Sequence, residues 1–198
     1  YGLDPHVLTS PTTGSSRDYR RELRLLYAAV QEIVRVFMDE LVGGTGASCG
    51  GEGVTDDHPW LPPLPILLET CIAHGMRSGS GDELWRVVAR VFEGTPGVDN
   101  TLRFGSLRTG IGKLRVWVRL GLMNKTLADE LLVLYENEGS ILKAPYHSWA
   151  MLRSDVLPPL AALLTSLDPL DFNLYVKEGD IDDRPLSIDW KELFVYPD

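Results

Sequence analysis

The chain has 198 residues, 44% of them hydrophobic, and a formal net charge of −9 at pH 7, which allows one well-filled core and favours a single domain. The acidic balance argues against a binder of nucleic acid or anionic membrane, because both need a dominant positive field to hold phosphates. No apolar run approaches the roughly 18 residues of a membrane helix, and two cysteines do not make a disulfide framework, so we expect a protein of the reducing cytosol.

The first predicted element is a long one-sided helix. It follows a lead-in over residues 1–14, which shows neither a starting methionine nor a signal pattern, so we expect a segment of a longer protein. Ser15 or Ser16 can cap the helix, its apolar residues recur every three or four positions, and it should end near Leu41. Residues 43–57 contain six glycines and are predicted to form a mobile loop.

Two shorter helices are predicted next. A proline-rich approach leads to a helix over residues 66–74 that ends at Gly75. Ser80 and Glu83 then form a capping box at the start of a helix that runs to residue 93, and the following segment to residue 100 has the composition of turns. Both helices carry apolar faces that need a partner to cover them.

The stretch over residues 103–134 organises the rest of the chain. Its helix is apolar on almost every side, which is typical of a helix in the middle of a bundle. Thr126 and Ser154 are predicted to cap two later helices, and the acidic tail contains aromatic residues that should pack back onto the bundle. Strand-like alternation and internal repeats are absent from the sequence, so the predicted fold class is all-α, a single-domain bundle of about eight helices.

Basic residues are segregated on the central stretch. Between residues 100 and 128 there are six basic side chains and no acidic one. Arg108, Arg115 and Arg119 form one stripe, because seven and eleven residues nearly complete whole helical turns. One interpretation is that Arg108 or Arg119 pairs internally with a carboxylate, for example from the acidic tail. Lys113 and Arg115 are expected to project outward from the end of the bundle.

A second basic group ends the helix before Gly75. His74 and Arg77 lie next to a break in structure, where an imidazole and a guanidinium can face a partner. The alternative for His74 is a helix C-terminal cap that is stabilised by the helix dipole.

Metal binding and catalysis are both weakly supported. Cys71 and His74 are three residues apart on one helix, and Cys49 and His58 would complete a zinc set by composition, but the paired-cysteine spacing of zinc sites is missing. The glycines before Lys113 lack the Ser or Thr of a phosphate-binding loop, and neither a serine-nucleophile nor a zinc-protease motif is present. We therefore expect no metal, no cofactor and no enzymatic activity.

Two blocks of the sequence resemble the RUN domain. The first runs from His58-Pro-Trp to His74-Gly-Met-Arg77, and the second is Gly112-Lys-Leu-Arg-Val-Trp-Val-Arg119 with the leucines that follow. The likeness covers residues 20–174 and is greatest to RUN domains of SH3-containing adaptors. Together with the composition of the two ends, it predicts a lead-in over 1–14, a RUN-like helical domain over 15–174 that includes the loop 43–57, and an acidic tail over 175–198 that packs on the domain.

The resemblance also implies a function. RUN domains are non-catalytic modules that commonly serve as effector surfaces for Rap, Rab or Arl small GTPases in signalling and vesicle trafficking. By resemblance, the partner contacts are expected on His74, Arg77, Lys113 and Arg115, with Arg108 and Arg119 as a secondary basic stripe. The alternative is a nucleotide-independent scaffold for kinase, ubiquitin-ligase or motor components. In either case we expect a cytoplasmic protein, recruited to vesicle or endosomal membranes through its partners.

Overall fold

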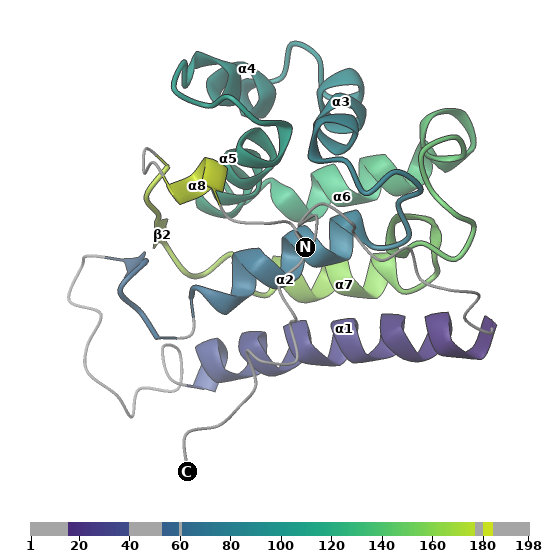
Figure 1. Cartoon of the computed structure of the whole chain (residues 1–198). Helices are drawn as coiled ribbons and strands as arrows, with labels where there is room; N and C mark the ends of the chain where they lie inside the picture. The colour runs from purple at the N-terminus through teal and green to yellow at the C-terminus, as the bar shows by residue number, and fades with distance from the viewer. Residues whose placement is uncertain (1–15, 40–52, 60, 177–179, 184–198) are drawn as a thin grey trace, which may run out of the picture.

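The computed structural model describes residues 16–39, 53–59, 61–176 and 180–183, and these are mostly helical (Figure 1). This confirms the predicted all-α bundle. A π-helical turn, Glu138–Leu142, and a 3-10 turn, Met151–Arg153, lie between the last long helices. In chain order the described helices are α1 (Ser16–Phe37), α2 (Pro63–Ala73), α3 (Gly81–Val91), α4 (Pro96–Arg103), α5 (Gly110–Met123), α6 (Leu127–Glu136), α7 (Leu157–Thr165) and the one-turn α8 (Asp180–Asp183).

Helix α5 lies in the middle of the bundle, as its apolar circumference predicts. It packs against α2, α3, α4, α6 and α8. Leu114, Val116, Trp117 and Val118 are completely buried. At its start, the Thr109 hydroxyl accepts a hydrogen bond from the Gly112 N–H at 3.0 Å, which satisfies one of the free donors of the first turn. Burial of a large apolar side chain is worth about 1.5–3 kcal/mol, so this helix contributes much of the core.

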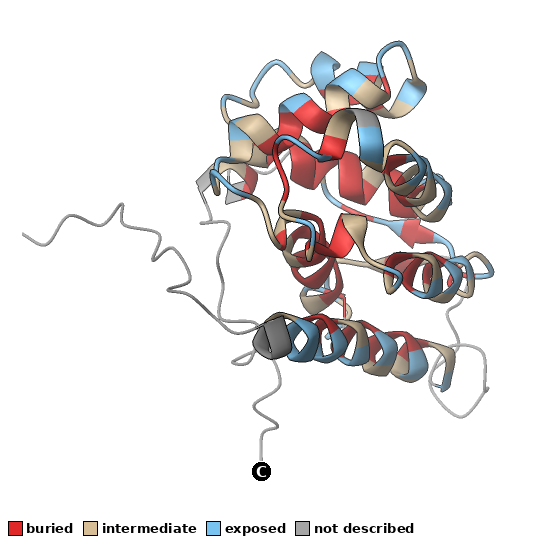
Figure 2. Ribbon diagram, turned by 90° about the vertical axis from the view of Figure 1, so that its right-hand side faces the viewer, coloured by how far each residue is buried: buried red, intermediate tan, exposed pale blue. Residues whose placement is uncertain are grey.

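Helix α1 covers one side of the bundle and packs on α2 and α7 (Figures 1 and 2). Figure 2 shows the buried residues of α1 on the side toward the other helices and the exposed residues on the opposite side. Residues 38 and 39 continue the chain as a π-helical turn, and the predicted end near residue 41 lies outside the described residues. Among the described helices, none combines the length and apolar character that a membrane crossing requires. The buried face of α1 is formed by Leu23, Leu26, Val30, Ile33, Val34 and Phe37.

Four local predictions are wrong. The segment predicted as turns holds helix α4, which begins with a proline at its first position, where the missing N–H costs nothing. Thr126 makes no side-chain cap to α6, and Ser154 does not cap α7, which begins at Leu157. The end of the predicted mobile loop is fixed: β1 (Val54–Thr55) pairs in parallel with β2 (Phe172–Asn173). Strands of two residues are too short to show a period in the sequence. Residues 43–52 of that loop lie outside the described part of the chain.

The carboxyl group of Glu130, which lies where α4, α5 and α6 meet, is only partly hydrogen-bonded. Oε2 of Glu130 and Nε1 of Trp117 are both buried and lack a hydrogen-bond partner. A Cβ atom at Gly97 would lie 3.2 Å from Oε1 of Glu130 and 3.5 Å from Nε1 of Trp117, so the three residues are close neighbours. Desolvation raises the pKa of Glu130 to about 7, and the Asp129 charge adds to this while a hydrogen bond with Thr126 opposes it.

Glu130→Gln should therefore make the domain more stable at alkaline pH. The pKa of Glu130 is near 4.5 when the group is exposed, so between that pH and about 7 the folded state holds a proton that the unfolded state has lost, and stability falls as pH rises. Water screens part of this effect because Glu130 is not fully buried. The free energy of unfolding of the variant should exceed that of the wild type by about 1–2 kcal/mol at pH 8 and equal it at low pH. Urea unfolding at both pH values measures this. An equal difference at the two pH values would contradict it.

Candidate functional site

Arg115 does not project from the end of the bundle. Its side chain is buried, with 1% of the residue exposed, between α2 and α8. Nε donates a hydrogen bond to Oε2 of Glu69 at 3.0 Å, and Nη1 donates one to the carbonyl oxygen of Ile181 at 2.6 Å. The expectation of an outward Arg115 is therefore wrong. The reason is that both neighbours come from distant segments, α2 and the C-terminal α8, which fold over the start of α5.

The other two arginines of the stripe have different surroundings. Arg119 is buried and pairs internally, because Nη2 lies 3.1 Å from Oδ1 of Asp56 and Nε donates to the carbonyl oxygen of Tyr175 at 3.1 Å. Arg108 is exposed, while its backbone N–H donates to Oδ2 of Asp182 at 2.9 Å. Arg115 and Arg119 thus connect α5 to the C-terminal segment, and of the three arginines in the stripe only Arg108 is exposed.

His74 is also a structural residue. It is buried after the last turn of α2, and its Nδ1 accepts a hydrogen bond from the Met151 N–H at 3.1 Å. The proton of a neutral ring therefore sits on Nε2, which lies 3.6 Å from Oε2 of Glu22 on α1. The ring also meets Trp149 edge to face, with centroids 5.3 Å apart. The expectation that His74 faces a partner is wrong, since the segment after α6 covers it.

An aromatic stack borders this covered histidine. Trp149 stacks with the rings of Tyr19 and His147, with ring centroids 3.8 Å and 5.0 Å away and nearly parallel planes. Desolvation and the nearby Arg77 charge both lower the pKa of His147, so its ring is neutral at pH 7. The stack was missed in the sequence because its members lie on two segments far apart in the chain. The one local signal was the His-Ser-Trp sequence between two predicted helices.

Arg77 stands at the edge of this region. The backbone N–H of Arg77 donates to the Pro145 carbonyl at 2.9 Å, and the His147 N–H donates to the Gly75 carbonyl at 2.9 Å, which joins the two segments as a short antiparallel bridge. The backbone of Arg77 is thereby held while its side chain is exposed. Lys113, one turn into α5, is partly exposed. Of the four predicted contact residues, Arg77 and Lys113 are the two that face outward.

The described residues offer little to a metal or a substrate. Cys71 is buried, and desolvation raises the pKa of its thiol to about 12, so it is protonated at neutral pH and unsuited as a zinc ligand or nucleophile. Among the residues that the structure describes, no three His, Cys, Asp or Glu side chains gather as a metal site would require. Cys49 lies outside the described part.

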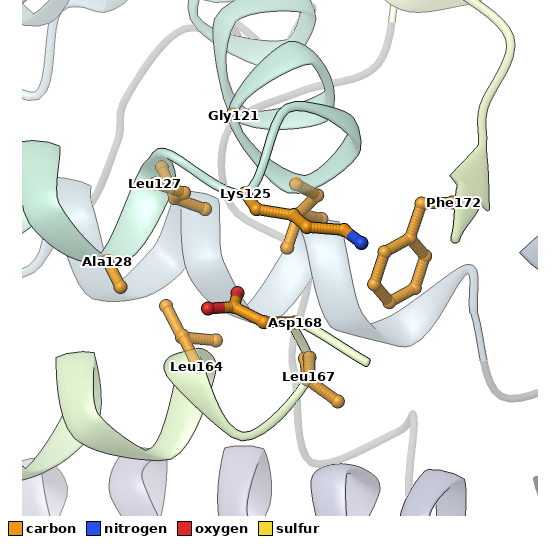
Figure 3. A pocket seen from close by; sticks show the side chains of 9 residues that line it. Gly121, Lys125, Leu127, Ala128, Leu164, Leu167, Asp168 and Phe172 are labelled. Carbon is orange, nitrogen blue, oxygen red and sulfur yellow. The ribbon is translucent and has the colours of Figure 1, made fainter. Parts of the chain in front are cut away.

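A small hollow lies between the α5–α6 turn and the end of α7 (Figure 3). Its free volume is about 10 Å³, room for about one water molecule. The Lys125 amine at its edge points toward Phe172 and lies 3.0 Å from Oδ1 of Asp171. The hollow is far too small for a typical small-molecule substrate, which needs several hundred Å³, roughly 300 or more.

Comparisons with known proteins show which proteins this chain is similar to. A family model described as RUN domain matches residues 64–178. Human RUN and FYVE domain-containing protein 1 is 28% identical over 149 residues, which cover 71% of this chain and 21% of that protein. Rat protein RUFY3 is 26% identical over 152 residues, or 71% of this chain and 32% of RUFY3. Human FYVE and coiled-coil domain-containing protein 1 is 24% identical over 185 residues, or 86% of this chain and 12% of that protein. The chain thus spans less than a third of the length of these relatives.

Proposed function

The chain belongs to the RUN domain family, and from this premise we propose that it is a protein-interaction module that captures a small GTPase of the Rap, Rab or Arl type in its GTP-loaded state. The observation that carries the proposal is the pair of outward cations, Arg77 beyond α2 and Lys113 on α5, on a chain whose central stretch carries no acidic residue between positions 100 and 128. The expected likeness of this chain to the RUN domains of SH3-containing adaptors stays a prediction.

The physical role of these cations is steering and orientation. Positive side chains on a rigid helical frame raise the rate at which an acidic partner docks in the correct orientation, and they contribute less to final affinity than buried contacts do. Arg77 is well suited to this because its backbone is fixed to Pro145 while its guanidinium remains exposed. A surface of this kind fits a transient interface of modest area. In this reading the protein is cytoplasmic and reaches vesicle or endosomal membranes through its partner.

His74, Arg115 and Arg119 contribute to the interface only indirectly. They hold α2, α5 and the C-terminal segment in place, so their loss would disturb the surface by disturbing the fold. This divides the predicted contact set into two outward residues that can touch a partner and buried residues that position them. The exposed Arg108 side chain, next to the start of α5, remains available as a further contact.

A pull-down with a panel of Rap, Rab and Arl GTPases tests the proposal. Each GTPase is loaded either with a non-hydrolysable GTP analogue or with GDP and mixed with the same amount of domain. We expect one member to be captured only in the GTP state, because an effector reads the nucleotide-dependent conformation. Equal capture in both states would instead favour a nucleotide-independent scaffold for kinase, ubiquitin-ligase or motor components, and capture of none would reject the GTPase assignment.

A further inference from the structure

A short C-terminal segment lies across the beginning of α5. We call α8, residues 180–183, the strap. The Asp182 carboxylate accepts three hydrogen bonds there: from the Arg108 N–H at 2.9 Å, the Thr109 N–H at 3.3 Å and the Thr109 hydroxyl at 2.7 Å. Any side chain at Gly112 would collide with this carboxylate, so the glycine permits the close approach. The start of α5 is therefore built to receive a carboxylate.

The strap has a second anchor one residue earlier. Ile181 is 3% exposed, and its carbonyl oxygen accepts a hydrogen bond from Arg115 at 2.6 Å. The guanidinium of Arg115 is thus shared between Glu69 of α2 and the backbone of the strap. Figure 1 shows α8 beside α5 at the edge of the bundle, not within it. A slot for one apolar side chain and a receptor for one carboxylate lie next to each other.

The start of α5 favours anions because it is the positive end of the helix dipole. The Gly110 N–H already donates to Oδ1 of Asp82 at 2.7 Å and the Gly112 N–H donates to the Thr109 hydroxyl, so the strap carboxylate is held by the donors of Arg108 and Thr109 just before the helix. Lys113 and the exposed Arg108 add positive charge on either side of Gly112. Although desolvation opposes it, the hydrogen bonds from Arg108 and Thr109 lower the pKa of Asp182, so the strap is held as a carboxylate at neutral pH.

We propose that the strap is a displaceable internal ligand and that the start of α5 is a docking site for a partner segment in which a branched apolar residue precedes an aspartate. The occupant's chemistry is taken from the strap itself, which shows what the site binds. The contact is one helical turn with one buried apolar side chain, so it opens at a lower cost than the core. This inference rests on the proposed function only in taking the partner to be a protein, and it adds that the partner must displace Ile181 and Asp182.

The first test supplies the strap sequence in trans. A fluorescent peptide of residues 178–185 is titrated against the wild-type domain and against the double variant Ile181→Ala and Asp182→Asn, whose own strap is weakened. In the wild type, the peptide can bind only those molecules whose strap is open, which lowers its apparent affinity. The variant should therefore bind the peptide at least about ten-fold more tightly. A peptide carrying the same two substitutions is the control and should not bind. A folded variant that ignores the native peptide would overturn the proposal.

Hydrogen exchange on the wild-type domain decides the matter if the variant fails to fold. The amides of Arg108 and Thr109 are bonded to Asp182, whereas those of Val116 and Leu120 lie within α5. We expect the first pair to exchange at least about a hundred-fold faster, through local opening of the strap. Exchange of all four together would show that the strap opens only with the whole fold, which rejects the proposal. Neither measurement uses a GTPase, so the peptide titration and the hydrogen exchange can still be interpreted if the panel pull-down fails.

Discussion

Arg115→Ala will destabilise the domain by about 3–5 kcal/mol, because removal of one partner of a buried ion pair leaves the other charge in a poorly solvated place. The Arg115 guanidinium is enclosed with 1% of the residue exposed and contacts Glu69 at 3.0 Å. It also donates to the Ile181 carbonyl, so the variant loosens the strap as well. Urea unfolding of the variant and the wild type measures the difference in the free energy of unfolding.

Two further variants separate this cause from a general effect of losing an arginine. Arg86→Ala, at an exposed position of α3, should change stability by no more than about 0.5 kcal/mol. The double variant Glu69→Leu and Arg115→Met removes both charges and keeps apolar volume, so it should recover a large part of the loss. A cost below about 1 kcal/mol for Arg115→Ala would show that the pair is not the structural contact described above.

Gly75→Ala will cost about 2–5 kcal/mol, for two reasons that add. The residue has φ of +75°, a left-handed conformation that costs a residue with a Cβ about 1–2 kcal/mol. The new Cβ would also lie 2.5 Å from Cβ and 2.6 Å from Cα of Ala150, and forced overpacking costs about 1–3 kcal/mol more. Gly75 therefore permits the segment after α6 to lie directly on the end of α2.

Gly94→Ala is the matched control for this prediction. Gly94 also has φ of +75°, but a Cβ there would meet nothing within 4 Å. Its substitution should cost only the conformational part, about 1–2 kcal/mol. Chemical unfolding of the two variants under identical conditions gives the comparison. Equal losses at both positions would mean that the close approach to Ala150 contributes nothing.

Much of the fold follows from local patterns. The all-round apolar α5 predicts its central place, and the left-handed Gly75 and Gly94 mark the ends of α2 and α3. The Ser80 cap is confirmed by a hydrogen bond from the Glu83 N–H. These signals work because each depends on residues a few positions apart.

The missed elements have physical reasons too. Helix α4 is only eight residues long, and its Pro96 and Gly97 are common in turns as well as at helix starts. The paired strands β1 and β2 are 118 residues apart at Val54 and Phe172, and two residues carry no period. Such pairing depends on how the whole chain folds, and local sequence patterns do not show which distant segments come together.

The same limit explains the candidate site. Helical spacing places Arg108, Arg115 and Arg119 on one stripe, but it does not show that α2 and α8 cover Arg115 or that the turn after β1 covers Arg119. The contact residues Glu69, Asp56 and Ile181 lie 46, 63 and 66 residues away in the chain. Arg77 differs because its exposure follows from a local feature, the break in structure after His74.

We propose that Arg77 and Lys113 touch the partner, whereas the buried arginines only support the fold. The most direct measurement is capture of the GTP-loaded panel by the double variant Arg77→Glu and Lys113→Glu, beside the wild type and a control with Arg86→Glu and Arg90→Glu on the exposed side of α3. We predict that the wild type and control capture one member, and that the double variant loses at least about 90% of this capture, a ten-fold effect of about 1.4 kcal/mol, with an unchanged melting temperature. Undiminished capture by the double variant, or a melting temperature that falls with it, would contradict the claim.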